Sequence, residues 1–395
     1  MKQGWETRKL IEVCEVFADG DWVESKDQSI EGIRLIQTGN VGEGVFKDRA
    51  EKARYISEAT FRKLRCTEIY EGDCLVSRLP DPVGRSCILP SISDRMITAV
   101  DCTILRFKSD KLISSFFNFY SQSEGYLTAV AKECTGTTRN RISRNNLGLI
   151  SIPVPPLAEQ QRIVSILDEA FEGIATAKAN AEQNLQNARA LFESYLQSVF
   201  THKGEGWVET TLGEIGKVSM CKRIFKEETI TTGGIPFFKI GTFGKEPDAF
   251  IPNQTYNEYR AKYPFPKKGD VLISASGTIG RRVRYDGEPA YFQDSNIVWI
   301  DNDENQVLND YLYHFYAACD WNSTKGATIA RLYNDNLRRI VIAFPSSLHQ
   351  QRLVVNQLTS LSEETLRLAA VYERKIAALD ELKKSLLHQA FSGAL

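Results

Sequence analysis

The chain contains 395 residues, of which 42% are hydrophobic and 25% are charged, and this is enough for two globular domains with cores of their own. The formal net charge of −1 excludes a large positive field over the whole protein, so any DNA-binding surface has to be local. The sequence has no apolar signal core and no stretch near the roughly 20 apolar residues of a membrane span. We therefore expect a cytoplasmic protein without membrane association, whose eight cysteines, with no C-x-x-C pair, are buried thiols.

The chain is internally duplicated from its first elements to its last. Three pairs of segments carry the repeat: residues 32–39 with 234–241, 71–77 with 268–274, and 155–162 with 345–352. The offset between the copies falls from 202 to 197 to 190 residues, and loops absorb such deletions readily. Each copy therefore corresponds to one domain and the segment that follows it.

The front of each copy is a mixed domain. Short β-like runs at 74–77, 271–274 and 297–300 are punctuated by Gly-Asp pairs and by separate prolines and glycines, which are typical of turns. We predict an α+β fold with two pseudo-repeated domains, at residues 1–156 and 204–346.

The back of each copy, residues 157–203 and 347–395, predicts a long helix. Apolar residues recur on a 4-3 spacing that is typical of a coiled-coil seam. The residues expected to pair the helices are Ile163, Leu167, Ile174, Leu191, Leu358, Leu361, Leu368 and Leu379. Helices of this length, about 60 Å, are too long for one small domain to bury, so we expect an antiparallel spacer between the domains. The alternative is that each amphipathic helix packs on its own domain.

Motifs for catalysis are missing from the sequence. It contains no G-x-x-x-x-G-K-[ST] loop for nucleotide phosphates and no N-P-P-[YF] turn of an adenine methyltransferase. The four histidines, His202, His314, His349 and His388, are scattered without metal-like spacing, and we interpret them as structural. We expect a chain with no catalytic residue, metal or cofactor of its own. A self-contained DNA methyltransferase or nuclease, and a scaffold that binds only proteins, remain as alternative hypotheses.

Two kinds of segment could contact DNA. Residues 135–146 hold three arginines with amides and hydroxyls and no acid, which suits phosphates and base edges. Residues 274–282, with the counterpart 77–85, combine glycines with arginines, so that backbone N–H groups could approach phosphates. The alternatives are a polar surface loop and tight turns between core strands. The predicted DNA-binding residues are Arg78, Arg85, Arg139, Asn140, Arg141 and Arg144 in the first copy, and Ser276, Thr278, Arg281, Arg282, Lys325 and Arg331 in the second.

The pattern resembles the specificity subunits of type I restriction-modification enzymes. The resemblance is carried by residues 269–274 with 277–281, and by residues 150–164, which recur as 340–354, and it extends over essentially the whole chain. The first copy departs from it with Arg78-Leu79-Pro80-Asp81-Pro82, which puts individual contact residues in doubt.

This resemblance implies that each domain recognises one half of a bipartite, asymmetric DNA site, with the helices setting the spacer. It also implies a non-catalytic subunit that binds double-stranded DNA and two methyltransferase subunits, which two restriction subunits join for cleavage. S-adenosylmethionine, ATP and Mg would then bind to these partners.

Overall fold

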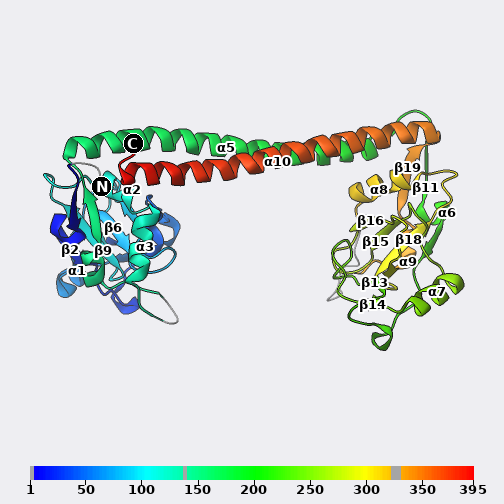
Figure 1. Cartoon of the computed structure of the whole chain (residues 1–395), viewed down its shortest axis with the longest axis horizontal. Coiled ribbons are helices and arrows are strands. Elements are labelled where there is room, and N and C mark those ends of the chain that lie inside the picture. The colour runs from blue at the N-terminus through cyan, green and yellow to red at the C-terminus, as the bar shows by residue number, and fades with distance from the viewer. Residues whose placement is uncertain (1–3, 137–139, 322–330) are drawn as a thin grey trace. The chain divides into compact units, whose positions relative to one another are not determined.

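A computed structural model describes residues 4–136, 140–321 and 331–395 (Figure 1). The chain divides into two units, of which the first comprises Met1–Glu182 with Arg374–Leu395 and the second comprises Gln183–Glu373. Two helices of 45 residues, α5 (Leu157–Thr201) and α10 (Leu348–Ser392), contribute one part to each unit.

The first unit is built around an antiparallel sheet with strand order β2-β9-β6-β7. All four residues of the inner strand β6 (Cys74–Ser77) are buried, because both faces of the sheet are covered. Successive side chains of a strand point to opposite faces, so Cys74 and Val76 pack against the helices, whereas Leu75 packs against a second sheet. The other elements of this layer are β2 (Cys14–Asp19), β7 (Ser86–Ile88), β9 (Cys102–Phe107), α2 (Ser114–Tyr120), α3 (Glu124–Lys132) and α4 (Arg144–Leu149).

The second sheet of this unit is mixed, with strand order β4-β3-β8-β5 and a parallel pair β3–β8. Its outer face is covered by α1 (Glu58–Leu64), whose Phe61 and Leu64 pack on Ile56 and Ile97. A separate antiparallel pair of β1 and β10 leads into α5. The strand bounds are β1 (Glu6–Lys9), β3 (Ile33–Ile36), β4 (Arg54–Ile56), β5 (Glu68–Ile69), β8 (Met96–Thr98) and β10 (Ser151–Val154).

The second unit repeats this topology apart from one edge strand, and this confirms the predicted duplication. Its main sheet has the order β12-β18-β15-β16, its second sheet the order β14-β13-β17, and the pair β11–β19 leads into α10. In the described residues of this unit, the second sheet has no counterpart of β5. The bounds are β11 (Trp207–Thr211), α6 (Leu212–Ile215), β12 (Lys217–Ser219), β13 (Ile235–Phe238), β14 (Phe250–Ile251), α7 (Asn253–Lys262), β15 (Val271–Ser274), β16 (Arg282–Arg284), β17 (Tyr291–Phe292), β18 (Ile297–Asp301), α8 (Asn309–Ala318), α9 (Asn334–Arg338) and β19 (Val341–Pro345).

A buried glutamine joins each long helix to the unit that precedes it. Gln160 is fully buried; it accepts from the Ile113 N–H at 2.9 Å and donates to the carbonyls of Lys111 and Pro155 at 2.9 and 2.8 Å. Gln351 makes the equivalent bonds in the second unit, to Leu308, Gln306 and Pro345. The equivalent residues are therefore Gln160 and Gln351, an offset of 191, and not the pair at 190 that matching the Gln-Gln-Arg letters suggests.

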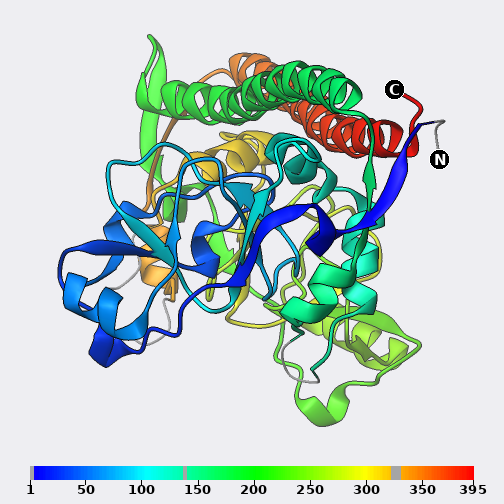
Figure 2. The same cartoon turned by 90° about the vertical axis from the view of Figure 1, so that its left-hand side faces the viewer.

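Within each unit, α5 and α10 run antiparallel. In the first unit Lys178 pairs with Asp380 at 2.6 Å, and Arg162 donates to the Leu395 carbonyl at 2.8 Å. Figures 1 and 2 show the start of α5 and the end of α10 side by side over this unit. In the second unit Arg189 pairs with Glu373 at 2.7 Å. The helices also pack on the domains, since Leu167 and Leu387 belong to the core of the first unit.

The helix seam differs in part from the prediction. Ile163, Leu167, Ile174 and Leu358 are buried and Leu361 and Leu379 are half-buried, but Leu191 and Leu368 are 53% and 44% exposed, so the predicted pairing role of these two is wrong. Seven residues of a straight helix fall about 20° short of two turns, so a heptad position gradually rotates out of the seam. By the end of α5, Leu196 is buried whereas Tyr195, on the heptad spacing from Leu191, is exposed, and in α10 Ala369 is buried next to Leu368.

Among the described residues, no helix has the length and apolar character needed to cross a membrane. All eight cysteines are free thiols; six are buried, and Cys134 and Cys319 are partly exposed.

Candidate nucleic-acid interface

The structure brings together the two segments that the sequence singles out in the first copy, and in the second copy it places the predicted Arg331 next to the segment 274–282. We call residues 77–85 and 274–282 the glycine loops, and residues 135–146 the polar loop of the first unit. The Ile142 N–H of the polar loop donates to the Arg78 carbonyl at 3.4 Å. In the second unit, the Leu332 N–H donates to the Ala275 carbonyl at 2.8 Å, and Ser276 forms a β-bridge with Arg331. Each unit thus presents one composite surface made of two loops.

Arg78 lies beneath this surface. Its side chain is 3% exposed, donates to the Val100 carbonyl at 2.6 Å and lies 3.1 Å from Asp19. Burial lowers the pKa of Arg78 from its usual value, and the Asp19 charge opposes this shift. The expected direct contact of Arg78 with DNA does not fit this position, and the residue instead holds the two loops together.

Arg85 and Arg281 are equivalent arginines, and both are used internally. Arg85 is 8% exposed and donates to four backbone carbonyls, at distances of 2.7 to 3.0 Å. Two of these belong to its own glycine loop, and two belong to Thr38 and Val41. Arg281 donates in the same way to the Phe243 carbonyl at 3.0 Å. The direct DNA contact predicted for Arg85 is therefore wrong, because its donors are occupied inside the protein, and Arg281 shares this positioning role.

Of the predicted contact residues on the first composite surface, Asn140, Arg141 and Arg144 are exposed. The side chains of Arg141 and Arg144 are 47% and 44% exposed, and they lie 3.0 Å from Asp101 and 4.0 Å from Asp19. Each guanidinium has five N–H donors, so an ion pair on one side leaves donors for a phosphate or a guanine edge.

The second composite surface is more closely packed. Ser276 is 9% exposed and donates to Asn296 at 2.9 Å, Arg331 donates to the Ser295 carbonyl at 3.2 Å, and Thr278 is exposed. The Arg282 guanidinium lies 4.6 Å from the Tyr313 ring centroid, and burial lowers its pKa. Predicted residues Arg139 and Lys325 lie outside the described residues.

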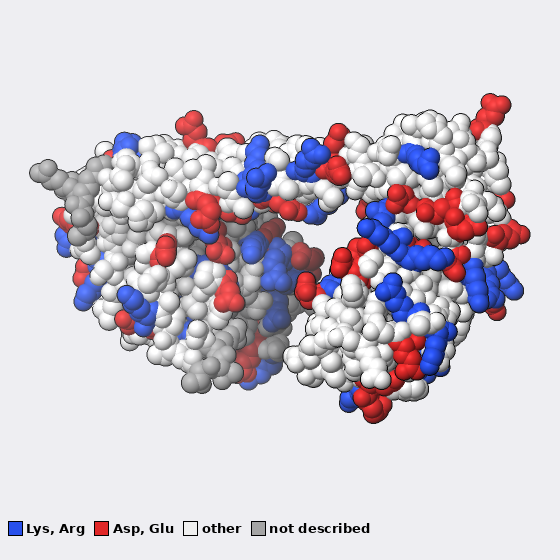
Figure 3. Space-filling model, turned by 45° about the vertical axis from the view of Figure 1, so that its right-hand side comes forward, with Lys and Arg blue, Asp and Glu red and all other residues white. Residues whose placement is uncertain are grey.

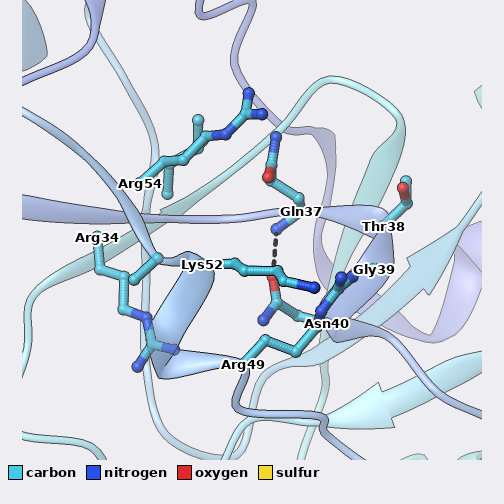
Figure 4. Close-up of a pocket in the computed structure, with 10 residues that line it drawn as sticks. Arg34, Gln37, Thr38, Gly39, Asn40, Arg49, Lys52 and Arg54 are labelled. Carbon is cyan, nitrogen blue, oxygen red and sulfur yellow. Dashed lines mark hydrogen bonds between the residues drawn. The ribbon is translucent and has the colours of Figure 1, made fainter. Parts of the chain in front are cut away.

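A cation-lined hollow of about 370 Å³ in the first unit was not predicted from the sequence (Figure 4). We call it the basic hollow, and it is lined by Arg34, Leu35, Gln37, Thr38, Gly39, Asn40, Arg49, Lys52, Ala53 and Arg54. Its cations alternate with acids in the run Lys47-Asp48-Arg49-Ala50-Glu51-Lys52-Ala53-Arg54, so composition alone hides them. The available signal was the repeated Gly32–Gly39 segment, which sequence reasoning used only to find the duplication.

Charge on both units is mixed. Residues 1–155 carry 22 basic and 21 acidic side chains, and residues 206–345 carry 17 of each. Figure 3 shows the two kinds interspersed on the visible face of both units. Within the described part of the chain, no cluster of three or more His, Cys, Asp or Glu side chains is arranged to hold a metal ion.

Comparisons with known proteins agree on one family. A family model described as type I restriction modification DNA specificity domain matches residues 2–187 and 204–376. A Haemophilus influenzae protein assigned as a type I restriction enzyme specificity subunit is 45% identical, covering 67% of this chain and 70% of the relative. The type I restriction enzyme StySPI specificity subunit of Salmonella potsdam is 22% identical, with 74% and 68% covered.

Solved structures share the fold. A chain from a study of the assembly and conformational transition of the type I R-M system has a TM-score of 0.80 at 19% identity, with 100% of this chain and 99% of that chain covered. The HsdS subunit from Thermoanaerobacter tengcongensis has a TM-score of 0.66 at 19% identity, with 100% and 98% covered.

Proposed function

Because this chain belongs to the type I restriction modification DNA specificity domain family, we propose that its two units recognise the two halves of a bipartite site in double-stranded DNA. The observation that carries this proposal is one scaffold built twice with different surfaces. The strand order, the junction glutamine and the glycine-loop arginine recur. The loop side chains differ, for example Arg78 where the second unit has Ala275. Because the two units present different side chains, they recognise two different half-sites, and the whole site is asymmetric.

Base and phosphate contacts in this proposal come from the exposed residues of the two composite surfaces. In the first unit these are Asn140, Arg141 and Arg144, because arginine pairs with guanine and asparagine with adenine. In the second unit the candidates are the exposed Thr278 and the half-buried Arg331, one of whose N–H groups already donates to the Ser295 carbonyl.

The chemistry belongs to partner subunits in this proposal. Two methyltransferase subunits bind S-adenosylmethionine and methylate adenine, and restriction subunits with ATP and Mg join for cleavage. The chain itself is non-catalytic and positions them. Support for a protein partner comes from α10, where Leu353, Leu368 and Val371 are 50%, 44% and 47% exposed. Leu353 and Val371 are 18 residues apart, about five helical turns, so they share a face, and exposed apolar faces of this kind mark protein contacts.

The test is co-expression with the cognate methyltransferase subunit in a host without other adenine methylation, followed by genome-wide mapping of methylated adenines. We expect a bipartite motif, one half of which changes when residues 206–345 are replaced by another recognition domain. Methylation that does not depend on this chain would contradict the proposal. Binding of S-adenosylmethionine by the isolated chain would instead support a self-contained methyltransferase.

A further inference from the structure

We propose that the basic hollow is a DNA-backbone site of the first unit, where Arg49, Lys52 and Arg54 bind phosphates next to the first half-site. This inference rests on the function proposed above, and it adds a contact with the DNA backbone that does not depend on the base sequence. It also predicts that the two units bind DNA with different dependence on salt.

The charge of the hollow is available to a ligand. Arg49, Lys52 and Arg54 are exposed, and no ion pair within 4.0 Å joins any of them to a carboxylate in the described parts of the chain. Arg34 is different, because its side chain is 5% exposed and pairs with Asp48 and, at 3.8 Å, with Asp94. Arg34 thereby engages Asp48, and Glu51, the other acid of the run, forms no ion pair within 4.0 Å with Arg49, Lys52 or Arg54 in the described parts of the chain.

The hollow is shaped by a tight turn that its own residues organise. The Asn40 side chain accepts from the Gln37 N–H at 3.0 Å and donates to the Lys47 and Asp48 carbonyls at 2.8 and 2.9 Å. Figure 4 shows Arg49 and Lys52 extending toward this turn and Arg54 lying beside Gln37. A Cβ atom at Gly39 would overlap the Arg49 guanidinium, so glycine allows Arg49 to lie against the turn. Cations, an amide and the Thr38 hydroxyl thus line one concave surface, a donor set that suits phosphate oxygens.

The hollow adjoins the composite surface of the same unit. The Arg85 side chain donates to the Thr38 carbonyl at 2.9 Å, at the wall of the hollow, and to the Leu79 carbonyl at 2.7 Å, in the glycine loop. A duplex lying on the composite surface therefore continues toward the hollow, and this favours its backbone over a free nucleotide as the ligand.

The second unit lacks these cations. Strand register pairs Leu35 with Arg54 in the first unit, whereas in the second unit the Phe237 N–H donates to the carbonyl of Ala249, which is buried. Lys239 stands at the position of Gln37, but it pairs with Asp248 at 2.8 Å. The duplicated scaffold thus supplies an internal control for the site.

The test measures binding of a scrambled duplex to the full chain, co-purified with its methyltransferase partner, over a series of salt concentrations. Each phosphate contact contributes about 0.9 to the slope of log K against log salt. The slope is negative, and we expect Arg54→Gln to reduce its magnitude by about 0.9. The triple Gln variant of Arg49, Lys52 and Arg54 should reduce the magnitude by about 2 to 3. Lys239→Gln, the matched control, should leave it unchanged because Asp248 already compensates that charge.

Gly39→Ala tests the geometry without removing a charge. We expect a slope between those of the parent and Arg49→Gln, because the Arg49 guanidinium is the end of a flexible, exposed side chain that shifts but keeps its charge, and no added effect in the Arg49→Gln background. Thermal unfolding of each variant should match that of the parent, since the altered side chains are exposed.

Failure of this inference is distinguishable from failure of the proposed function. A parent complex that prefers its mapped motif over the scrambled duplex, with an unchanged slope in all four hollow variants, overturns the hollow and leaves the function standing. No preference in the parent, with a lower slope in the variants, supports the hollow and overturns the specificity role. Loss of binding to a fluorescent ATP analogue with an unchanged DNA slope would mean that the hollow takes a free nucleotide, which also overturns the inference.

Discussion

Replacing the junction glutamine of the first unit tests how the long helix is attached. Gln160→Leu keeps a similar volume but removes the partner of one N–H and two carbonyls, of which that of Pro155 is buried and those of Ile113 and Lys111 are partly buried. Each such group costs about 1 to 3 kcal/mol, and because those of Ile113 and Lys111 are only partly buried, we expect roughly 3 to 6 kcal/mol out of a summed range of about 3 to 9 kcal/mol. For a unit of this size that lowers the melting temperature by about 10 °C or more. Gln160→Glu should be equally harmful, because a carboxylate oxygen would then face two carbonyls.

The assay is thermal unfolding of the full chain, with hydrogen exchange to locate the change. We expect faster exchange in residues 108–113 and in β10, and parent-like exchange in the second unit. Gln161→Leu is the matched control, because Gln161 is the exposed neighbour in the same helix. A loss below about 1 kcal/mol for Gln160→Leu, or an equal loss for Gln161→Leu, would refute the reasoning.

Three further predictions concern other parts of the chain. Burial lowers the pKa of His314 from 6.5 to about 4, so the unfolded state gains a proton first as the pH falls, and stability drops through this window. Between pH 7.5 and 5 this costs at most about 2 kcal/mol, and melting curves of His314→Gln should lose that component of the pH dependence. Arg85→Lys should lower the melting temperature without DNA present, because roughly 1.5 to 3 kcal/mol of charged hydrogen bonding is lost; parent-like melting with lost DNA binding would restore the contact role. Leu368→Glu with Val371→Glu should reduce co-purification of the methyltransferase subunit at least tenfold, an estimate of about 1.4 kcal/mol, while the melting temperature stays unchanged; full retention would remove the partner from this face.

The architecture could be predicted from the sequence because the internal duplication of the chain is visible in its apolar runs and turn residues. The buried run Cys74–Ser77 and its counterpart Val271–Ser274 are the inner strands of the two main sheets. Their glycine and polar neighbours do meet in space. What the sequence could not supply was the direction of each side chain. An arginine beside a glycine either stays exposed or donates hydrogen bonds inside the protein, depending on which backbone carbonyls are close to it. Arg85 donates to four such carbonyls.

The helix seam was predictable only while the heptad stayed in phase. Near the domains, Leu167 packs in the core of the first unit and Leu358 is fully buried, so either period identifies them. Farther along α5, the difference between 3.5 and 3.6 residues per turn accumulates, and small or polar side chains such as Ala188 give no guide to the correct phase. The heptad pattern then predicts Leu191 as a seam residue because it is a large apolar side chain, although Leu191 is exposed and lies outside the seam.

The difference between buried side chains that bind the backbone and exposed side chains that do not explains how one scaffold can carry two specificities. Gln160 with Gln351 and Arg85 with Arg281 recur because each binds backbone carbonyls, and backbone groups are present whatever the loop sequence. The exposed side chains need no such match, and Arg54 on one edge strand corresponds to Ala249 on the other. Stability therefore depends on side chain to backbone bonds below the surface, while recognition depends on side chains above it. Surface residues can consequently diverge between the units, and change the half-site each unit recognises, without a cost to the fold.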